Sequence, residues 1–258
     1  MATLYVVATP IGNLEDITYR AVRVLGEVPV LACEDTRTTR KLLARYTIPR
    51  PAKLLAYHEH NEERAAAGIA ALLDQGQDVA LCSDAGYPGV SDPGYRLIAA
   101  AIDAGHRVEV LPGAGAVEPA LLASGLPGAS FTFKGFPPRK PGPRRRFLEA
   151  DAASPHTLVF YESPHRVAVL LHDALQVLGD RRAAVCVELT KKFEGTHRGW
   201  LKDLTAHFAD RAIRGEVTVV IAGRHPKFIR EGEAGEPARG RLPPLSERIT
   251  KREPIRRA

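Results

Sequence analysis

Short apolar runs alternate along the first half of the chain with longer segments whose apolar positions recur at helical spacing. The runs predict buried strands, and the longer segments predict amphipathic helices. The predicted strands cover residues 4–8, 28–33, 53–56, 79–82 and 108–111. Strict alternation of strand and helix is typical of a mostly parallel sheet, so the pattern predicts an α/β domain.

A polar cluster follows each of these predicted strands. The clusters cover residues 9–16, 34–37, 58–62, 83–92 and 113–115. In a parallel sheet the carboxyl ends of the strands lie at one edge, which is where open α/β sheets bind ligands. We therefore expect the five clusters to converge on a single active site.

The cluster after the fourth strand is part of a long loop, residues 83–94. Its glycines permit close backbone approach or a positive φ, and Pro88 and Pro93 stiffen the chain. Loops of this kind usually span about 2–6 residues, so this length favours a ligand site over an ordinary turn. We predict that Asp92 caps the helix that follows, with Pro93 in its first position.

The second half has a different pattern. Predicted strands at residues 158–161, 183–187, 195–200 and 216–222 are mixed with helical and hairpin-like pieces, which predicts a mixed or antiparallel sheet. Composition changes after residue 127. We therefore expect an N-terminal domain (1–127), a C-terminal domain (128–223) and a basic, flexible tail (224–258) without apolar periodicity.

A proline-rich basic segment lies near the start of the C-terminal domain. Its prolines and glycines predict no helix before about residue 144. Its cations are Lys134, Arg139, Lys140, Arg144, Arg145 and Arg146. Since no acid accompanies them, the segment is either a solvated linker or a loop that contacts phosphates.

Composition limits the function classes. The 258 residues include 45% apolar side chains, enough for a real core, and the net charge of +6 is consistent with an anionic partner. The three cysteines lie in apolar runs without disulfide or zinc spacing, so we expect no metal. No apolar run reaches about 18 residues and no secretion signal is visible, so we expect a cytoplasmic protein without a membrane span.

Two polar clusters carry candidate chemistry. Glu34 and Asp35 lie beside Arg37, where they form either a salt-bridged helix start or a site that positions substrate and accepts a proton. His58 and His60 alternate along an extended segment and would point to opposite faces. A polar substrate-contacting cluster is therefore favoured over a metal site. The chain has neither a phosphate-binding P-loop nor a nucleophile elbow.

A set of motifs recurs in one order along the chain: TPIGNLEDIT (9–18), EDTR (34–37), HEHNE (58–62), SDAG (83–86), DPG (92–94), SGLP (124–127), FYES (160–163), HR (165–166) and ELTK (188–191). Together they resemble the bacterial 16S rRNA (cytidine-2′-O)-methyltransferase family, RsmI, of the tetrapyrrole-methylase superfamily. The match runs unbroken from about residue 4 to residue 223.

The resemblance implies a two-domain tetrapyrrole-methylase fold with S-adenosylmethionine in the cleft between the domains, and a homodimer. It implies methylation of the ribose 2′-hydroxyl of a cytidine in 16S rRNA or the small ribosomal subunit. It assigns the methyl donor to Pro10, Ser83, Asp84, Ala85, Gly86, Tyr87, Gly115, Ala116, Phe160, Tyr161 and Leu189.

Within that reaction, the base that accepts the hydroxyl proton is expected to be Glu34 or Asp35, with His58 as an alternative. Arg37, Asn61 and Glu62 are expected to place the nucleotide. The six cations of the basic segment are expected to contact its phosphates, which hold RNA without specifying its sequence.

The chain departs from the family at the expected donor site. The family usually has threonine at the position of Tyr87, and proline with a small residue at Ala114 and Gly115. Tyr87 would either stack on the ligand or narrow the pocket. The family's C-terminal helical extension is not recognisable in residues 224–258. Two other functions stay open: a methylase of the same fold acting on a tetrapyrrole or a modified protein side chain, and an RNA-binding relative that has lost catalysis.

Overall fold

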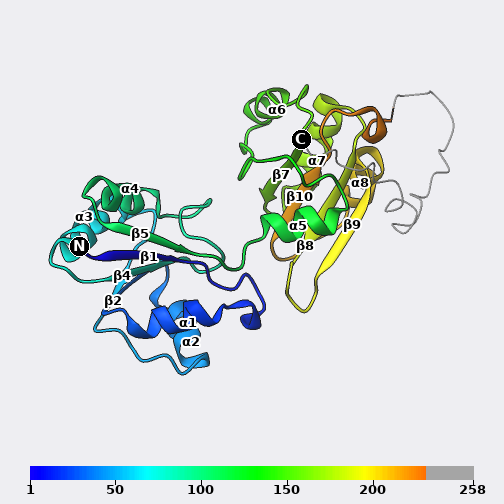
Figure 1. Cartoon of the computed structure of the whole chain (residues 1–258). Coiled ribbons are helices and arrows are strands. Elements are labelled where there is room, and N and C mark those ends of the chain that lie inside the picture. Colours follow the sequence, from blue (N-terminus) through cyan, green and yellow to red (C-terminus); the bar gives the residue numbers. More distant parts are fainter. Residues whose placement is uncertain (231–258) are drawn as a thin grey trace, which may run out of the picture.

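In the computed structural model, which describes residues 1–230, the chain forms two α/β domains that lie side by side (Figure 1). The first domain has a five-stranded sheet in the order β3-β2-β4-β1-β5, in which every neighbouring pair is parallel. Its strands are β1 (Thr3–Val7), β2 (Val30–Cys33), β3 (Lys53–Ala56), β4 (Val79–Cys82) and β5 (Arg107–Leu111). The parallel sheet predicted from the sequence is confirmed.

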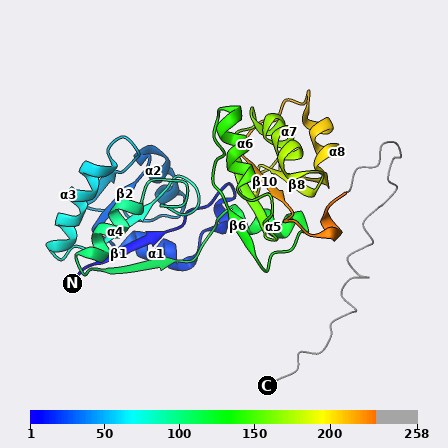
Figure 2. The same cartoon turned by 90° about the horizontal axis from the view of Figure 1, so that it is seen from above.

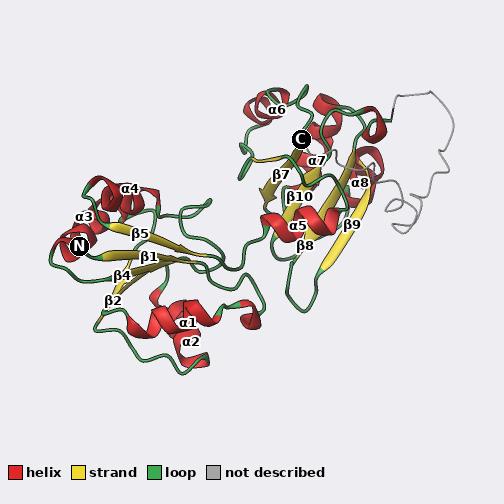
Figure 3. Ribbon diagram, viewed as in Figure 1, coloured by secondary structure: helices red, strands yellow, loops and turns green. Residues whose placement is uncertain are grey.

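Two helices cover each face of this sheet (Figure 3). On one face, α1 (Tyr19–Glu27) and α2 (Thr36–Arg45) share an apolar cluster, and on the other α3 (Glu62–Asp74) and α4 (Tyr95–Asp103) share a second one. β1 and β4 are neighbours, yet they lead to helices on opposite faces. Open α/β sheets form their ligand crevice at the carboxyl ends of such a pair of strands.

The second domain has a mixed sheet in the order β6-β7-β10-β8-β9, as predicted. Only β6 and β7 pair in parallel; the other neighbours are antiparallel. Its strands are β6 (Phe131–Phe133), β7 (Thr157–Glu162), β8 (Arg182–Val187), β9 (Gly195–Trp200) and β10 (Val217–Ile221). The helices are α5 (Val117–Ser124) on one face, and α6 (Pro141–Glu149), α7 (Val167–Leu178) and α8 (Leu201–Phe208) on the other (Figure 2).

Helix α5 belongs by packing to the second domain. Its Ala120 and Leu121 are buried in one cluster with Val159 of β7 and Val220 of β10. The packing boundary therefore falls after β5, earlier than the expected boundary at residue 127. The physical reason is that α5 finds an apolar surface on the second sheet, whereas both faces of the first sheet already carry two helices.

The expected tail begins later than residue 224. Arg230 forms an ion pair with Asp203 at 3.0 Å and stacks over Trp200, and its backbone N–H donates to the Asp180 carbonyl at 2.8 Å. Residues 224–230 thus pack on the second domain, with a 3-10 helix at Pro226–Phe228. The rest of the expected tail, 231–258, lies outside the described residues. Within residues 1–230 no helix combines the length and apolar composition that a membrane span needs.

Helix α6 starts at Pro141, earlier than predicted, because a proline is well tolerated in the first turn. Arg144 is only 5% exposed, and its guanidinium bonds Asp173 of α7 at 2.7 Å. Arg145 pairs with the same carboxylate at 2.8 Å. The expectation that Arg144 contacts phosphates is therefore corrected, because its buried guanidinium holds α6 against α7. The Arg145 side chain is 53% exposed, and its contact with phosphates stays a prediction.

Arg144→Ala is expected to lower the free energy of unfolding by about 2–4 kcal/mol, because it removes one partner of a buried ion pair. The control is Arg146→Ala, two residues along and exposed, which is expected to change stability by less than about 0.5 kcal/mol. Urea unfolding followed by circular dichroism measures both. Equal losses from the two variants would contradict a structural role for Arg144.

Candidate functional site

The loop after β4, residues 83–94, pairs with the turn after β1. Thr9 and Gly86 exchange two backbone hydrogen bonds of 2.9 Å. The Thr9 hydroxyl also donates to the Ser83 carbonyl at 3.0 Å, and the Ser83 hydroxyl donates to the Gly86 carbonyl at 3.1 Å. The start of loop 83–94 is thus fixed against the turn that follows β1. At this point the chain leaves two neighbouring strands, β1 and β4, for helices on opposite faces of the sheet.

The same loop reaches the segment after β2. The backbone N–H of Asp35 donates to the Asp84 carboxylate at 3.1 Å. In return, the backbone N–H of Asp84 donates to the Glu34 carboxylate at 3.4 Å. These contacts place the acids of two polar clusters side by side, as the sequence predicts for strand ends of one parallel sheet.

The loop also contacts the segments after β3 and β5. The Glu62 carboxylate accepts the backbone N–H of Gly94 at 3.1 Å and the Tyr57 hydroxyl at 3.0 Å. The Tyr87 hydroxyl accepts the backbone N–H of Gly113 at 2.8 Å. Loop 83–94 is therefore bonded to the ends of all four other strands of its sheet.

Tyr87 lies next to Gly115. A Cβ built on Gly115 would lie 3.6 Å from the Tyr87 ring, which is an ordinary van der Waals contact. Both residues line a cavity of about 470 Å³ between the domains, together with Ile11, Glu118 and Thr190. The two positions at which the chain departs from the family are thus in contact, and Tyr87 forms part of the cavity wall.

The second domain closes on this cavity through residues 188–191. The backbone N–H of Asn13 donates to the Thr190 hydroxyl at 3.1 Å. A Cβ built on Gly12 would lie 2.3 Å from Lys191 Cγ and 2.8 Å from Thr190 Oγ1, so only glycine fits there. Lys191 is itself held by Glu188 at 2.9 Å. The first ten-residue motif and the ELTK motif therefore meet at the domain boundary.

Several residues expected at the donor site lie in one apolar cluster across this boundary. Ala85 and Ala116 pack in it with Tyr161 and Leu189. Burial raises the pKa of the Tyr161 hydroxyl to about 12, so it stays protonated near neutral pH. The cluster brings together the loop after β4, the turn after β5 and two segments of the second domain.

Phe160 is a correction to the expected donor site. Its side chain is 1% exposed and packs in the core of the second domain near Phe147, on the other face of β7 from Tyr161. Successive side chains of a strand point to opposite faces, so the two neighbours cannot face the same cavity. Pro10 and the Ser83 side chain are buried in the corner, whereas the Asp84 side chain is exposed.

Some cavity residues were missed by sequence reasoning. Ile11, Glu118 and Thr190 line the cavity but were absent from the expected set. Ile11 and Thr190 directly follow Pro10 and Leu189, which were expected at the donor site. The motifs that contain these pairs could therefore have indicated them.

Asp35 acts as a helix cap. Its carboxylate accepts the backbone N–H of Arg37 at 2.7 Å and pairs with the Arg37 guanidinium at 2.7 Å. These bonds hold the pKa of Asp35 at about 2, so it accepts a proton poorly near neutral pH. Of the two alternatives for this segment, the structure favours the salt-bridged helix start for Asp35 and Arg37.

Asp92 is not the helix cap that the sequence predicts. Helix α4 begins at Tyr95 with Gly94 as its N-cap. Burial, and after it the charges of Glu34 and Asp84, raise the pKa of the Asp92 carboxyl to about 6. A carboxyl with a raised pKa at a strand-end edge is a candidate for proton transfer. Sequence reasoning missed it because the shift depends on three loops meeting.

The cluster after β3 has mainly a structural role. Asn61 accepts the backbone N–H of His58 at 2.8 Å and donates to the Ala56 carbonyl at 2.9 Å. Glu62 is engaged by Tyr57 and Gly94, as described above. Asn61 and Glu62 thus have structural partners, and their contact with a nucleotide stays a prediction. His58 Nδ1 is buried without a hydrogen-bond partner among the described residues, and no group of His, Cys, Asp and Glu in residues 1–230 is arranged to hold a metal.

The basic segment retains only part of its expected role. Lys134 pairs with Asp151 at 2.7 Å and lies over the Phe147 ring. Like Arg144, it is therefore committed to contacts within the domain. Around the start of α6 the exposed cations are Arg139, Lys140, Arg145 and Arg146. Their contact with an anionic partner stays a prediction.

Comparison with known proteins places the chain among methylases. The family model described as Tetrapyrrole (Corrin/Porphyrin) Methylases matches residues 3–205. The chain is 48% identical to ribosomal RNA small subunit methyltransferase I of Halalkalibacterium halodurans, over 87% of this chain and 77% of that protein. It is 42% identical to the protein of the same name from Thermotoga maritima, over 87% of this chain and 100% of that protein.

Solved structures share the fold. The uroporphyrin-III C-methyltransferase of Thermus thermophilus, determined in complex with S-adenosylhomocysteine, aligns with a TM-score of 0.58 at 23% identity. The alignment covers 85% of this chain and 97% of that one. At this identity the likeness establishes the two-domain fold, and the expected fold class is confirmed.

Gly12→Ala is expected to lower the free energy of unfolding by about 1–3 kcal/mol, because the added methyl group overpacks the contact with residues 189–191. Gly68→Ala is the matched control. Gly68 lies in α3 with nothing within 4 Å of a built Cβ, so alanine there should stabilise by up to about 1 kcal/mol. Thermal unfolding measures both changes. A Gly12→Ala protein as stable as the wild type would contradict the described closure of the domains.

Asp92→Asn tests the raised pKa. The folded protein holds the proton of the Asp92 carboxyl more tightly than the unfolded chain does. The protonated carboxyl therefore stabilises the fold fully below about pH 4, and this stabilisation is lost as pH rises through about 6. The asparagine variant should therefore exceed the wild type in stability by about 1–2 kcal/mol above pH 6, allowing for partial exposure, and converge with it near pH 4. Melting temperatures measured from pH 4 to 8 test this. Asp210→Asn, at an exposed aspartate, is the control. A parallel pH profile for wild type and Asp92→Asn would refute the shift.

Proposed function

Because the chain belongs to the tetrapyrrole (corrin/porphyrin) methylase family, and within it to the ribosomal RNA small subunit methyltransferase I group, we propose that it methylates small-subunit rRNA. The methyl donor is S-adenosylmethionine, and the acceptor is the ribose 2′-hydroxyl of a cytidine in 16S rRNA. The relatives' names give the enzyme class and the RNA; the donor and the acceptor atom are the finer part of the proposal.

One observation carries the donor assignment. The cavity between the domains is lined by Tyr87 of loop 83–94 and the turn after β5 on one side and by Thr190 on the other. Small residues at 113–115 let a ligand approach the backbone. The Tyr87 ring and the apolar side chain of Ile11 provide surfaces for an adenine. This lining fits an adenosyl ligand that spans the domain boundary.

The donor supplies a methyl group already bonded to a good leaving group, the sulfonium sulfur. The protein's task is to hold the ribose oxygen in line with the methyl carbon at about 3–3.5 Å and to accept the hydroxyl proton.

Asp35 is unsuited as the base that accepts this proton, because its pKa is about 2. Glu34, Asp84 and Asp92 are the carboxylates described at this edge of the sheet that stay candidates for this role. Asp92 is favoured because its pKa is raised to about 6, closer to neutral pH. The rate is then expected to fall as pH drops below about 6.

The RNA assignment rests on charge as well as on family. The chain carries a net charge of +6, and exposed cations at Arg139, Lys140 and Arg146 can pair with phosphates. A cytidine must be unpaired or splayed out to bring its ribose into a cavity between two domains. We place the protein in the cytoplasm with its ribosomal substrate. The homodimer implied by the family resemblance is part of this proposal.

The two rival functions make different predictions. A tetrapyrrole methylase needs a large apolar substrate surface, whereas the exposed strand-end loops here carry acids and arginine. An RNA-binding relative without catalysis would follow if Tyr87 filled the donor site. In the structure the Tyr87 hydroxyl is tied to Gly113, so the ring lies along the cavity wall. This position favours stacking over exclusion of the ligand.

The proposal is tested by incubating the protein with methyl-labelled S-adenosylmethionine and small ribosomal subunits from a strain that lacks this methylation. We expect label on the ribose of one cytidine, identified by nuclease digestion and mass spectrometry. Subunits from a strain with the intact enzyme are the control and should accept little label. Label on ribosomal protein or on a base, or donor binding by calorimetry without any transfer, would overturn the assignment.

A further inference from the structure

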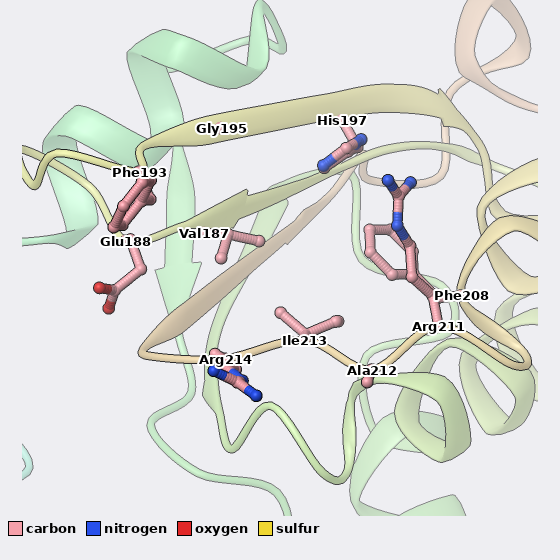
Figure 4. Close-up of a pocket in the computed structure, with 10 residues that line it drawn as sticks. All are labelled: Val187, Glu188, Phe193, Gly195, His197, Phe208, Arg211, Ala212, Ile213 and Arg214. Atoms are coloured by element: carbon pink, nitrogen blue, oxygen red, sulfur yellow. The ribbon is translucent and has the colours of Figure 1, made fainter.

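A second cavity, of about 360 Å³, lies in the second domain beside the β8–β9 hairpin (Figure 4). It is bordered by the end of β8, the hairpin loop 188–194, β9, the end of α8 and the segment that follows α8. Of the sequence motifs only ELTK reaches it, through Glu188, and the proposed methyl transfer does not use it. Figure 4 shows Phe193 and Arg211 at opposite ends, with Val187 and Ile213 between them.

The cavity combines an exposed aromatic ring with positive charge. Phe193 is 76% exposed at the tip of the hairpin, where burial does not account for it. Arg211 and Arg214 line the cavity, and neither has a carboxylate partner among the described residues. Val187 and Ile213 add an apolar floor. The Arg211 guanidinium also bonds His207 Nε2. An aromatic face beside guanidinium groups that have no carboxylate partner is a combination with which proteins hold single-stranded nucleic acid.

The one acid in the lining does not cancel this charge. Glu188 Oε1 accepts from Lys191 Nζ at 2.9 Å and from the backbone N–H of Glu216 at 2.9 Å. Burial lowers the pKa of His197, which leaves that ring neutral near pH 7. The net charge of the cavity near neutral pH therefore comes from the two arginines, and Lys192, 5.6 Å from the Phe193 ring, adds to it.

The hairpin loop connects this cavity to the donor site. Thr190 lines the cavity between the domains, while Glu188 and Phe193 line the second one. The loop is braced internally, because the backbone N–H of Thr190 donates to the Glu194 carboxylate at 2.7 Å. Phe193, which would hold the nucleotide, is thus separated from Thr190 in the wall of the cavity between the domains by only two residues of the chain.

We propose that the second cavity binds an unpaired nucleotide of the rRNA that flanks the target cytidine. Its base stacks on Phe193, and its phosphates pair with Arg211 and Arg214. The inference rests on the proposed function and adds a substrate-binding site to it. It also supplies a physical role for an aromatic side chain that the fold leaves in solvent.

The test compares two double variants for methylation of small subunits. Phe193→Ala/Arg214→Ala is expected to raise the KM for subunits by about tenfold or more, since a stacked base and a phosphate contact are lost. The salt dependence of RNA binding should also weaken by about one unit of slope. The affinity for S-adenosylmethionine, measured by calorimetry, should stay unchanged. Phe193→Trp, which keeps a stacking surface, should retain a KM close to that of the wild type.

The matched control is Val169→Ala/Arg45→Ala, which removes an exposed apolar and an exposed basic side chain elsewhere. If both double variants have the wild-type KM and salt slope, the second cavity does not bind RNA, although the proposed function stands. Sedimentation measures the oligomeric state of both double variants. A change of oligomeric state in Phe193→Ala/Arg214→Ala but not in the control would mean that a second copy of the protein covers the cavity, and would also overturn the inference. Absence of methyl transfer by the wild type would instead refute the proposed function.

Discussion

The hydrogen bonds of one loop determine how the whole site is assembled. Loop 83–94 is bonded to the segments that follow the four other strands of the first sheet, through Thr9, Asp35, Glu62 and Gly113. Each bond joins segments far apart in sequence, so the strand-end clusters form one surface instead of five independent loops. Because the loop is also stiffened by two prolines, little conformational entropy remains to be lost when a ligand binds.

The second domain closes the cavity that loop 83–94 borders on the side of the first domain. Residues 188–191 approach the first domain so closely that Gly12 has no room for a side chain. The ELTK motif thereby forms one wall of the cavity and also begins the hairpin whose tip carries Phe193. In the function proposed above, one short loop, braced by Lys191 and Glu194, would contact both the methyl donor and the RNA.

Local patterns predicted the elements well and their partners less well. The alternation of strand and helix in the first domain depends on neighbouring residues, and the parallel sheet that it predicts is present. Phe160 was misplaced because β7 is covered on both faces, so its apolar residues show no alternation that separates cavity from core. Arg144 and Asp92 were misjudged for a different reason. Their roles depend on Asp173 and on Glu34, residues that only the fold brings near.

The central claim is that the methyl donor lodges between loop 83–94 and residues 188–191. A crystal structure of the protein grown with excess S-adenosylhomocysteine tests it most directly. We predict electron density for the ligand in the cavity between the domains, in contact with Tyr87 and Gly115 on one side and with the Leu189–Thr190 backbone on the other. Density at any other place, or a cavity without ligand at a concentration that calorimetry shows to be saturating, would contradict the account.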